Sequence, residues 1–303
     1  MKAQTTTIHR SATRAPQSRT FWGDAWCRLR RNHATMLGLV AILLVVVLAS
    51  CAERCAPSPY DLQDMSATLQ PIGTPGHLLG TDQLGRDLLS RLIYGARISL
   101  GVSTLAQLLV LLIGIPIGLI AGSGGRWRDD ILMRGTDIIY AFPDLLFVIV
   151  MLSVLGRNVF YVPMAMGLIS WTTLARLVRA QVLSLRTCDF VLAAEVIGVP
   201  TWQIVLRHIL PHMLAPIIVT VTLGMPQFIL LEATLSFIGI GAPPPMPSWG
   251  LMVNEGFTAI FSYPHLVVIP GSAIAITTLS CTFVGDGLCD ALDPRQEHLG
   301  MDR

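Results

Sequence analysis

Long apolar runs separated by short polar segments dominate the chain. A helix needs about 20 apolar residues to cross the hydrocarbon core of a bilayer, and six segments approach that length. The fourth has a short apolar run that contains Pro163, but the distribution of charge described below requires it. The pattern therefore predicts an all-α, polytopic membrane protein with six transmembrane helices. The six predicted spans are residues 36–51, 98–122, 131–156, 159–177, 213–241 and 265–284.

Composition supports a membrane protein and excludes some chemistry. Of the 303 residues, 52% are hydrophobic and 13% are charged, whereas soluble domains contain about 25% charged residues. Lys2 is the only lysine. Since a phosphate-binding P-loop requires a Gly-Lys-Ser/Thr sequence, the chain is not expected to bind ATP in that manner. A Schiff-base lysine within the fold is excluded as well.

The positions of the basic residues predict the orientation of the spans. Residues 1–34 contain seven basic side chains and a single acid, Asp24. Basic segments stay on the cytoplasmic side, so the N-terminus is expected to be cytoplasmic. Six spans then place Arg126 and Arg128 inside, and they place residues 242–264, which contain no Lys or Arg, outside.

These observations give a domain plan. Aromatic residues alternate with arginines in residues 21–31, which favours an amphipathic helix at the anionic inner face of the membrane. The plan comprises a basic cytoplasmic tail with that helix (1–34), a first transmembrane helix (35–51), an external segment (52–95), a five-helix core (96–288) with a polar loop at 178–212, and a cytoplasmic tail (289–303).

The polar loop contains the most informative stretch, FVLAAEVIGVPTWQIVLRHILP at residues 190–211. Ala193 and Ala194 predict a helical surface of low relief that can sit in a groove of a partner. Gly198 can adopt a left-handed turn that ends one short helix before the next. Pro211 suits the first turn of a new helix. The alternative interpretation is an ordinary helix-turn-helix connection between two spans.

The loop resembles the EAA loop through which permeases of ABC importers dock onto their ATPases. Three other stretches strengthen the resemblance: residues 78–100 before the second span, 237–255 after the fifth and 285–295 at the end of the sixth. Together they resemble the C-type permease subunit of peptide and nickel ABC importers, the DppC/OppC type. The three sequences are LLGTDQLGRDLLSRLIYGARISL, FIGIGAPPPMPSWGLMVNE and GDGLCDALDPR.

The resemblance implies a type I ABC importer permease in the inner membrane, with both termini cytoplasmic. It implies a homologous B-type permease, two cytoplasmic ABC ATPases and an external solute-binding protein as partners, within the lipid membrane and without nucleic acid. The chain itself would hold no cofactor and would not be an enzyme, because the ATPases bind ATP and Mg²⁺. Di- or oligopeptides are the expected substrate, with nickel or another small solute as the alternative.

The resemblance also assigns residues to the ATPase-coupling loop. The chain departs from the family at Leu192, where the family has the glutamate of the EAA motif, and at Glu195, where arginine is frequent. Cys289 also replaces a frequent arginine. The coupling residues are predicted to be Ala193, Ala194, Glu195, Gly198, Arg207, Leu210 and Pro211.

Ionisable residues inside spans mark a polar route or a structural pair. Asp137 and Asp144 are seven residues apart and are expected on one face of the third span, and Glu232 lies within the fifth. All three are candidates for the translocation path. The alternative, that they pair with arginines or cap backbone groups, is equally weighted for Asp144 and Glu232. It is preferred for Asp137, with Arg134 as partner.

The remaining charged residues near the spans are predicted to have structural roles. Asp286, between two glycines, is expected to end the sixth helix. Four charged residues of the external segment are expected to form a local salt-bridged helix and not a ligand site: Asp82, Arg86, Asp87 and Arg91.

Two other classes of function fit the sequence less well. An ion-coupled secondary transporter using the three acids usually shows inverted repeats, which the sequence lacks. An intramembrane aspartyl protease needs two carboxylates that nearly touch, whereas seven residues on one helix separate them by about 10 Å. The scattered histidines and cysteines show no spacing typical of a metal site.

Overall fold

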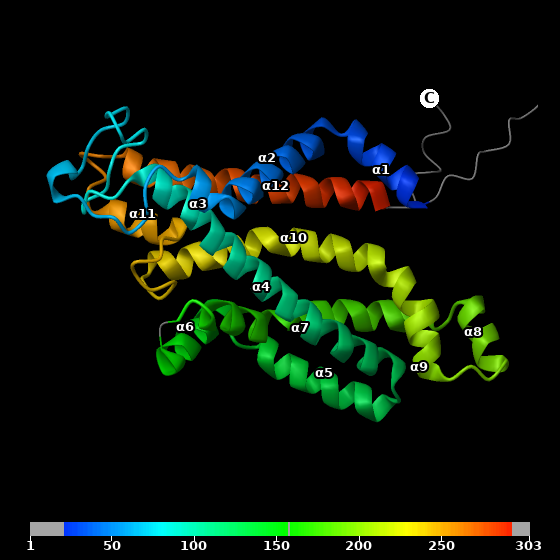
Figure 1. Ribbon diagram of the computed structural model, residues 1–303. Coiled ribbons are helices and arrows are strands. Elements are labelled where there is room, and N and C mark those ends of the chain that lie inside the picture. The colour runs from blue at the N-terminus through cyan, green and yellow to red at the C-terminus, as the bar shows by residue number, and fades with distance from the viewer. Residues whose placement is uncertain (1–20, 157, 293–303) are drawn as a thin grey trace, which may run out of the picture.

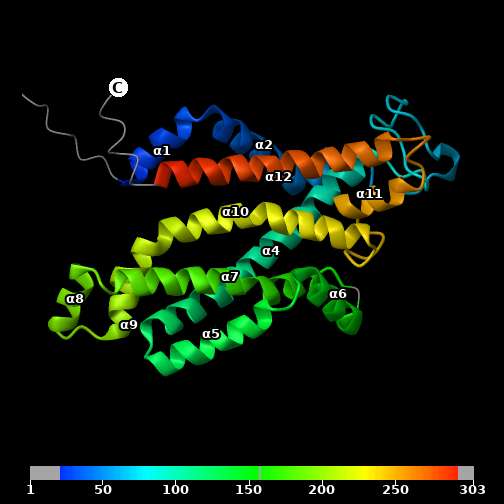
Figure 2. The ribbon, with the colours of Figure 1, turned by 180° about the vertical axis from the view of Figure 1, so that it is seen from behind.

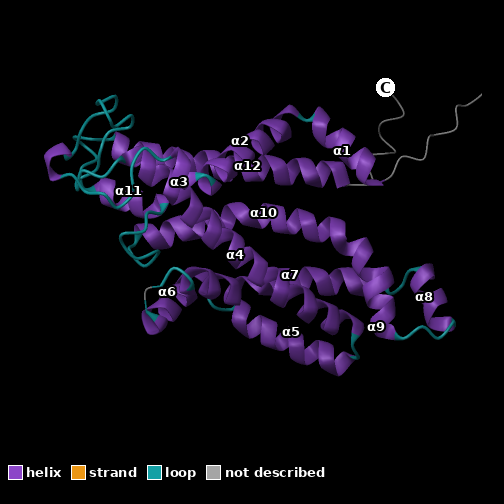
Figure 3. Ribbon diagram, viewed as in Figure 1, coloured by secondary structure: helices purple, strands orange, loops and turns teal. Residues whose placement is uncertain are grey.

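The computed structural model describes residues 21–156 and 158–292, so the predicted tail segments 1–20 and 293–303 lie outside the described residues. The regular structure of the described part is helical, without named strands (Figure 3). Its α-helices are α1 (Phe21–Arg31), α2 (His33–Ser50), α3 (Ala52–Cys55), α4 (Leu88–Ser123), α5 (Arg126–Tyr140), α6 (Asp144–Leu155), α7 (Tyr161–Leu185), α8 (Asp189–Val196), α9 (Thr201–Ile204), α10 (Leu210–Phe237), α11 (Trp249–Phe257) and α12 (His265–Leu292). A 3₁₀-helix, η1 (Met65–Ala67), and a π-helix, η2 (Val205–Ile209), complete the set.

The long helices form a bundle whose two ends differ. The loops around η1 and the helix α11 gather at one end, whereas α1, α8 and α9 lie at the other (Figures 1 and 2). Helix α2 packs against α12, α12 against α10, and α4 against α7. The largest apolar core joins α4, α6, α7, α8 and α10.

The apolar helices agree with a protein that crosses the membrane several times. Four stretches of the described chain are long and apolar enough to span: His33–Ser50, Leu88–Ser123, Thr201–Phe237 and His265–Leu292; α5 and α6 together give a fifth. Helix α7 does not meet the same test, but it is 25 residues long and lies inside the bundle with twelve buried residues. An interior helix need not be apolar all round, because its neighbours cover its polar positions. The six-span prediction is compatible with this arrangement.

The predicted third span, residues 131–156, is not one continuous helix. Helix α5 ends at Tyr140, α6 begins at Asp144, and the two axes bend by 82°. Pro143 disfavours the α conformation of the residue before it and donates no N–H. The prediction that Asp137 and Asp144 share one helical face is therefore wrong, since they lie on different helices.

Helix α4 extends beyond the predicted second span at its N-terminal end. Its 36 residues correspond to about 54 Å at 1.5 Å per residue, more than the roughly 30 Å of hydrocarbon. The Asp87 side chain caps it by accepting a hydrogen bond from Ser90 N at 2.8 Å. The first turns of α4 consequently lie at the end of the bundle that holds α11 and the loops around η1 (Figure 1).

Helix α12 also extends beyond its prediction. Asp286 is exposed within α12, and the helix continues to Leu292. The prediction that Asp286 ends the sixth helix is therefore wrong. Gly287 allows α12 to pass close to α2, because a Cβ at position 287 would lie 2.0 Å from Thr35 Oγ1 of α2.

A stripe of small residues brings α4 and α7 into close contact. Gly114, Gly118 and Gly122 of α4 recur every four residues and are buried. A Cβ at Gly118 would lie 2.6 Å from both Ala175 O and the Val178 Cβ atom of α7. Close approach of this kind is how helices pack in membranes, where burial of apolar surface gives little driving force.

Adding one methyl group at this contact should destabilise the protein. We expect Gly118→Ala to cost about 1–3 kcal/mol, because α7 backbone atoms must move to admit the methyl group. Gly101→Ala on the same helix is the matched control, since nothing lies within 4 Å of a Cβ there. Thermal unfolding of the purified protein should show a lower midpoint for Gly118→Ala only. Equal midpoints for the two variants would contradict the packing described.

Candidate functional site

The predicted coupling loop forms two short helices joined at a glycine. Helix α8 ends at Val196, and two residues later Gly198 has a φ of +86°. Gly198 N donates to Glu195 O at 3.0 Å, and Val199 N donates to Ala194 O at 3.1 Å. This pair of bonds is a Schellman motif, in which the position occupied by Gly198 must be left-handed. The left-handed turn predicted at Gly198 is present, and it sets the direction in which the chain continues to α9.

The loop has an inner face that packs on the bundle and an outer face that does not. Val191, Ala194 and Ile204 are buried in the main core. The outer face carries Ala193 and Glu195 together with large exposed apolar residues. Such a patch at the end of a bundle is typical of a protein-binding surface. The exposed apolar residues are Phe190, Leu192, Val196, Ile197, Trp202 and Leu206.

The outer face differs in one respect from the expected surface. Ala193 and Ala194 were both predicted to form the low-relief docking surface, but only Ala193 is exposed, and Ala194 is 8% exposed. Residues one position apart on a helix point about 100° apart, so both cannot face the same partner. Ala194 therefore positions α8 on the core, and the large apolar side chains supply the outer surface.

The loop rejoins the bundle through an irregular helical segment. The π-helix η2 leads into α10, and Leu210 N donates to Val205 O. Pro211 stands in the first turn of α10, as predicted, where its missing N–H costs least. Arg207 is exposed on η2. Single π-helical turns are frequent at functional sites.

A cavity of about 510 Å³ lies between α4, α5, α6, α7 and α10. Asp144 at the start of α6 lines it, and so does Gln107 of α4. Sequence reasoning identified Asp144 but missed Gln107, although an amide within an apolar run is a detectable signal. The lining is mixed, with polar side chains from Gln107, Tyr140, Asp144, Ser170, Thr172, Thr173, Thr220 and Gln227 among apolar ones.

Asp137 lies on the surface in an ion pair. Arg176 Nη2 donates to Asp137 Oδ1 at 2.7 Å, and both side chains are more than one-third exposed. The guanidinium of Arg176 also stacks on Tyr140, 4.0 Å from the ring centroid. Pairing with an arginine was the preferred interpretation of Asp137, but the partner is Arg176 of α7 and not the predicted Arg134. Asp137 and Arg176 are 39 positions apart in the sequence, so local spacing could not reveal this pair.

Glu232 is buried where α4, α10 and the start of α11 meet. It is 1% exposed and accepts a hydrogen bond from Ser236 Oγ at 2.7 Å. The side chains of Ser99 and Ser248 also lie near its carboxyl group. Glu232 is not among the residues that line the 510 Å³ cavity. The geometry thus favours the structural interpretation of Glu232, as a polar junction between helices.

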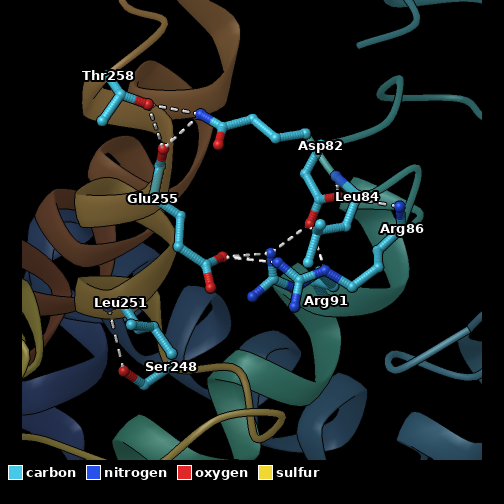
Figure 4. Close-up of polar contacts among 9 residues, drawn as sticks. Asp82, Leu84, Arg86, Arg91, Ser248, Leu251, Glu255 and Thr258 are labelled. Atoms are coloured by element: carbon cyan, nitrogen blue, oxygen red, sulfur yellow. Dashed lines mark hydrogen bonds and ion pairs between the residues drawn. The ribbon is translucent and has the colours of Figure 1, made fainter. Parts of the chain in front are cut away.

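A largely buried ionic cluster joins the segment before α4 and the start of α4 to α11, at the end of the bundle predicted to be external (Figure 4). Asp82 Oδ2 accepts hydrogen bonds from Arg86 Nε at 2.6 Å and Arg91 Nη1 at 2.5 Å. Glu255 Oε2 accepts from Arg91 Nη1 at 2.6 Å and Arg86 Nη2 at 3.0 Å. Gln83 adds a bond from Nε2 to Glu255 O at 2.9 Å. We call these residues, Asp82, Arg86, Arg91 and Glu255, the external clamp.

The external clamp corrects the prediction of a local salt-bridged helix. Asp82 and Arg86 precede α4, Asp87 caps it, and only Arg91 lies within it. The fourth member, Glu255, follows Arg91 by 164 residues. Asp82, Arg86 and Arg91 are each no more than 5% exposed, so the charges neutralise one another inside the protein and do not form a solvated surface.

Similarity to known proteins covers nearly the whole chain. Residues 114–298 match the family described as binding-protein-dependent transport system inner membrane component, and residues 20–71 match the N-terminal TM domain of oligopeptide transport permease C. The chain is 40% identical to the oligopeptide transport system permease protein OppC of Bacillus subtilis, over 92% of this chain and 91% of that protein. It is also 40% identical to the dipeptide transport system permease protein DppC of Alkalihalophilus pseudofirmus, over 91% and 90%.

Two further similarities complete the comparison. The glutathione transport system permease protein GsiD of Pectobacterium atrosepticum is 37% identical over 91% of this chain and 92% of that protein. Among solved structures, the inward-facing MetNI methionine ABC transporter shares the fold, with a TM-score of 0.54 and 17% identity over 68% of this chain and 98% of that one. The fold is that of a type I ABC importer permease. The chain belongs to the inner membrane components of binding-protein-dependent transport systems.

Proposed function

We propose that the chain is the C-type permease subunit of an ABC importer for di- or oligopeptides. The observation that carries the proposal is the match to oligopeptide and dipeptide permeases over nine-tenths of the chain, including the N-terminal domain specific to permease C. The apolar outer face of the EAA-like loop supports it, because a separate ATPase would cover that face.

The proposed assembly contains this chain, a homologous B-type permease, two cytoplasmic ATPases and an external binding protein, without nucleic acid. ATP and Mg²⁺ would be bound by the ATPases, and this chain would hold no cofactor and catalyse no reaction. Coupling would run through Ala193, Glu195, Gly198 and Arg207 at the loop, with Ala194, Leu210 and Pro211 holding the loop on the bundle.

Peptides are preferred over nickel as the substrate. Among the described residues, no three His, Cys, Asp or Glu side chains are grouped to hold a metal ion. The 510 Å³ cavity instead offers amides and hydroxyls around a single carboxyl group. We propose Asp144 as the path residue among the three acids, since Asp137 is paired at the surface and Glu232 is buried in a serine junction.

Affinity purification tests the assembly. This chain, tagged and extracted from its native membrane, should bring with it two ATPase chains and a homologous permease. The isolated chain should bind no nucleotide. Purification as a homo-oligomer without an ATPase would contradict the proposal and would favour a secondary transporter.

The proposed orientation places both termini in the cytoplasm, with α8 and α9 on the same side and α11 outside. The predicted domain plan follows the same scheme, in which the polar loop at 178–212 is cytoplasmic and residues 52–95 are external. Supporting this, α1 packs against the end of α12, and α8 and α9 lie at the same end of the bundle as α1 (Figure 1).

Cysteine labelling tests the orientation. In a cysteine-free background, single cysteines at Leu78 and Phe261, both exposed, should react with an impermeant reagent added to whole cells after removal of any outer membrane. Cysteines at Val196 and Trp202, also exposed in this chain, should react only after the membrane is opened and the ATPases that cover this face are removed. Labelling of Val196→Cys from outside would overturn the orientation.

A further inference from the structure

We propose that the 510 Å³ cavity binds the free N-terminal ammonium group of a peptide in transit, with Asp144 as its counter-charge and Gln107 as a contact to the peptide backbone. The inference rests on the proposed function and specifies the chemistry of the same path. It is carried by two polar groups of the cavity that have no hydrogen-bond or ion-pair partner among the described residues.

Asp144 is the first of these groups. In the part of the chain that the structure describes, its carboxyl group forms neither a hydrogen bond nor an ion pair, in contrast to Asp137, Asp129 and Glu232. It stands in the first turn of α6, where the helix dipole favours a negative charge. An unpaired acid within a membrane-spanning region is expensive and faces a wet cavity or a ligand.

Gln107 of α4 is the second group. Its side chain lines the cavity and is only 6% exposed, and its Oε1 atom is buried without a donor. Leaving a buried polar atom unpaired costs about 1–3 kcal/mol. Gly224 of α10 leaves room for the Gln107 amide, because a Cβ at position 224 would lie 2.8 Å from Gln107 Oε1. An amide can rotate to present its carbonyl or its NH₂, so it can pair with either polar group of a peptide unit.

The charge of the lining selects among ligands. Among the described residues that line the cavity, Asp144 is the only one with a carboxyl group, and none is Lys, Arg or His. Arg176, the basic group stacked on Tyr140, is already paired with Asp137. A divalent metal prefers several oxygen or nitrogen ligands including more than one charge, which one carboxylate does not provide. A monovalent ammonium group with N–H donors matches both the sign and the hydrogen-bonding need of the site.

Binding to the purified membrane complex tests this without any contribution from the binding protein. Trialanine carrying a fluorophore at its C-terminus is compared with the same peptide acetylated at its N-terminus, on the complex of both permeases and both ATPases. Asp144→Asn should weaken binding of the free peptide about tenfold, the loss of one charge-assisted hydrogen bond, and should leave binding of the acetylated peptide within about twofold.

Matched variants separate the roles of the two residues. Asp130→Asn removes an exposed acid of α5 that does not line the cavity, and it should change neither affinity. Gln107→Met keeps the length of the side chain and should weaken both peptides alike. Asp144→Ser, which retains a residue suited to a helix start, replaces Asp144→Asn if that variant does not reach the membrane.

The experiment distinguishes failure of this inference from failure of the proposed function. The inference is overturned if the unmodified complex binds neither peptide, or if Asp144→Asn weakens both equally. The same preparation, reconstituted with binding protein and ATP, then shows whether peptides are imported at all. Absence of peptide import would overturn the proposed function itself, whatever the binding result.

Discussion

Gly198→Val should abolish transport while leaving the amount of protein in the membrane unchanged. Gly198 occupies the left-handed position of a Schellman motif at φ +86°, and a β-branched residue there costs about 1–2 kcal/mol. The strain comes from the backbone alone, since nothing lies within 4 Å of a Cβ at this position. The chain can relieve it by opening the turn, which would rotate α8 and its exposed face relative to α9.

The consequence should be a loss of coupling and not of folding. The apolar spans direct insertion into the membrane, and the turn lies outside them. We expect ATPase activity to remain at its basal level and to lose its stimulation by loaded binding protein, with substrate uptake reduced to background. ATPase assays and uptake by the reconstituted complex measure the two effects on one preparation.

Gly125→Val is the matched control for this variant. Gly125 also lies in a loop where a Cβ would meet nothing within 4 Å, but its φ is −73° and its ψ is 164°. Valine adopts that conformation without strain, so uptake should persist. Leu192→Glu, which restores the family residue at an exposed position, should also retain uptake. Unmodified uptake by Gly198→Val at equal abundance would show that the loop does not couple the subunits.

Asp82→Asn should destabilise the protein by about 3–5 kcal/mol, the usual effect of removing one charge from a buried ionic group. Asparagine retains the shape of the side chain and an oxygen for the backbone N–H groups of Leu84 and Arg86, which now donate to Asp82 Oδ1. The variant therefore keeps these backbone contacts but removes the charge and, because an amide nitrogen cannot accept, the hydrogen bonds that Arg86 and Arg91 donate to Oδ2. Arg86 and Arg91 would then share a single carboxylate, that of Glu255.

Thermal unfolding of the purified complex, followed by a spectroscopic probe near α11, measures this effect. Asp64→Asn in the same segment is the control, because Asp64 is exposed and its acceptor role toward Ser66 passes to asparagine. Glu255→Gln should cost less than Asp82→Asn, since the Glu255 side chain is 27% exposed and the Asp82 side chain 8%. The double variant should be non-additive, because both acids bind Arg91 Nη1. Additive effects would show that the external clamp is not one unit.

Features that depend on local sequence could be predicted. The helices predicted at residues 21–31, 36–51 and 265–284 follow from runs of apolar or amphipathic residues, and helices are present at 21–31, 33–50 and 265–292. The turn at Gly198 follows from a glycine after a short helical pattern. Pro211 in the first turn of α10 follows from its missing N–H. Each of these rests on interactions within about four residues, which the order of amino acids displays directly.

Features that depend on tertiary contacts could not be predicted. The helical period placed Asp137 and Asp144 on one face, but the axes of α5 and α6 bend by 82°, an angle that the period of a continuous helix does not express. One partner of Arg91, Glu255, is 164 residues away. Two of the three serines near Glu232, Ser99 and Ser248, come from other parts of the chain. Arg176 and Arg179 lowered the hydropathy of α7, although α7 lies inside the bundle.

Uptake by the complete transporter tests the central claim most directly. The two permeases and two ATPases are placed in proteoliposomes, and labelled trialanine is supplied with or without binding protein, ATP, and a proton or sodium gradient. We predict uptake that requires both ATP and the binding protein and that does not respond to the ion gradients. Uptake driven by an ion gradient in the absence of ATP would contradict the assignment of this chain as the permease subunit of a peptide ABC importer.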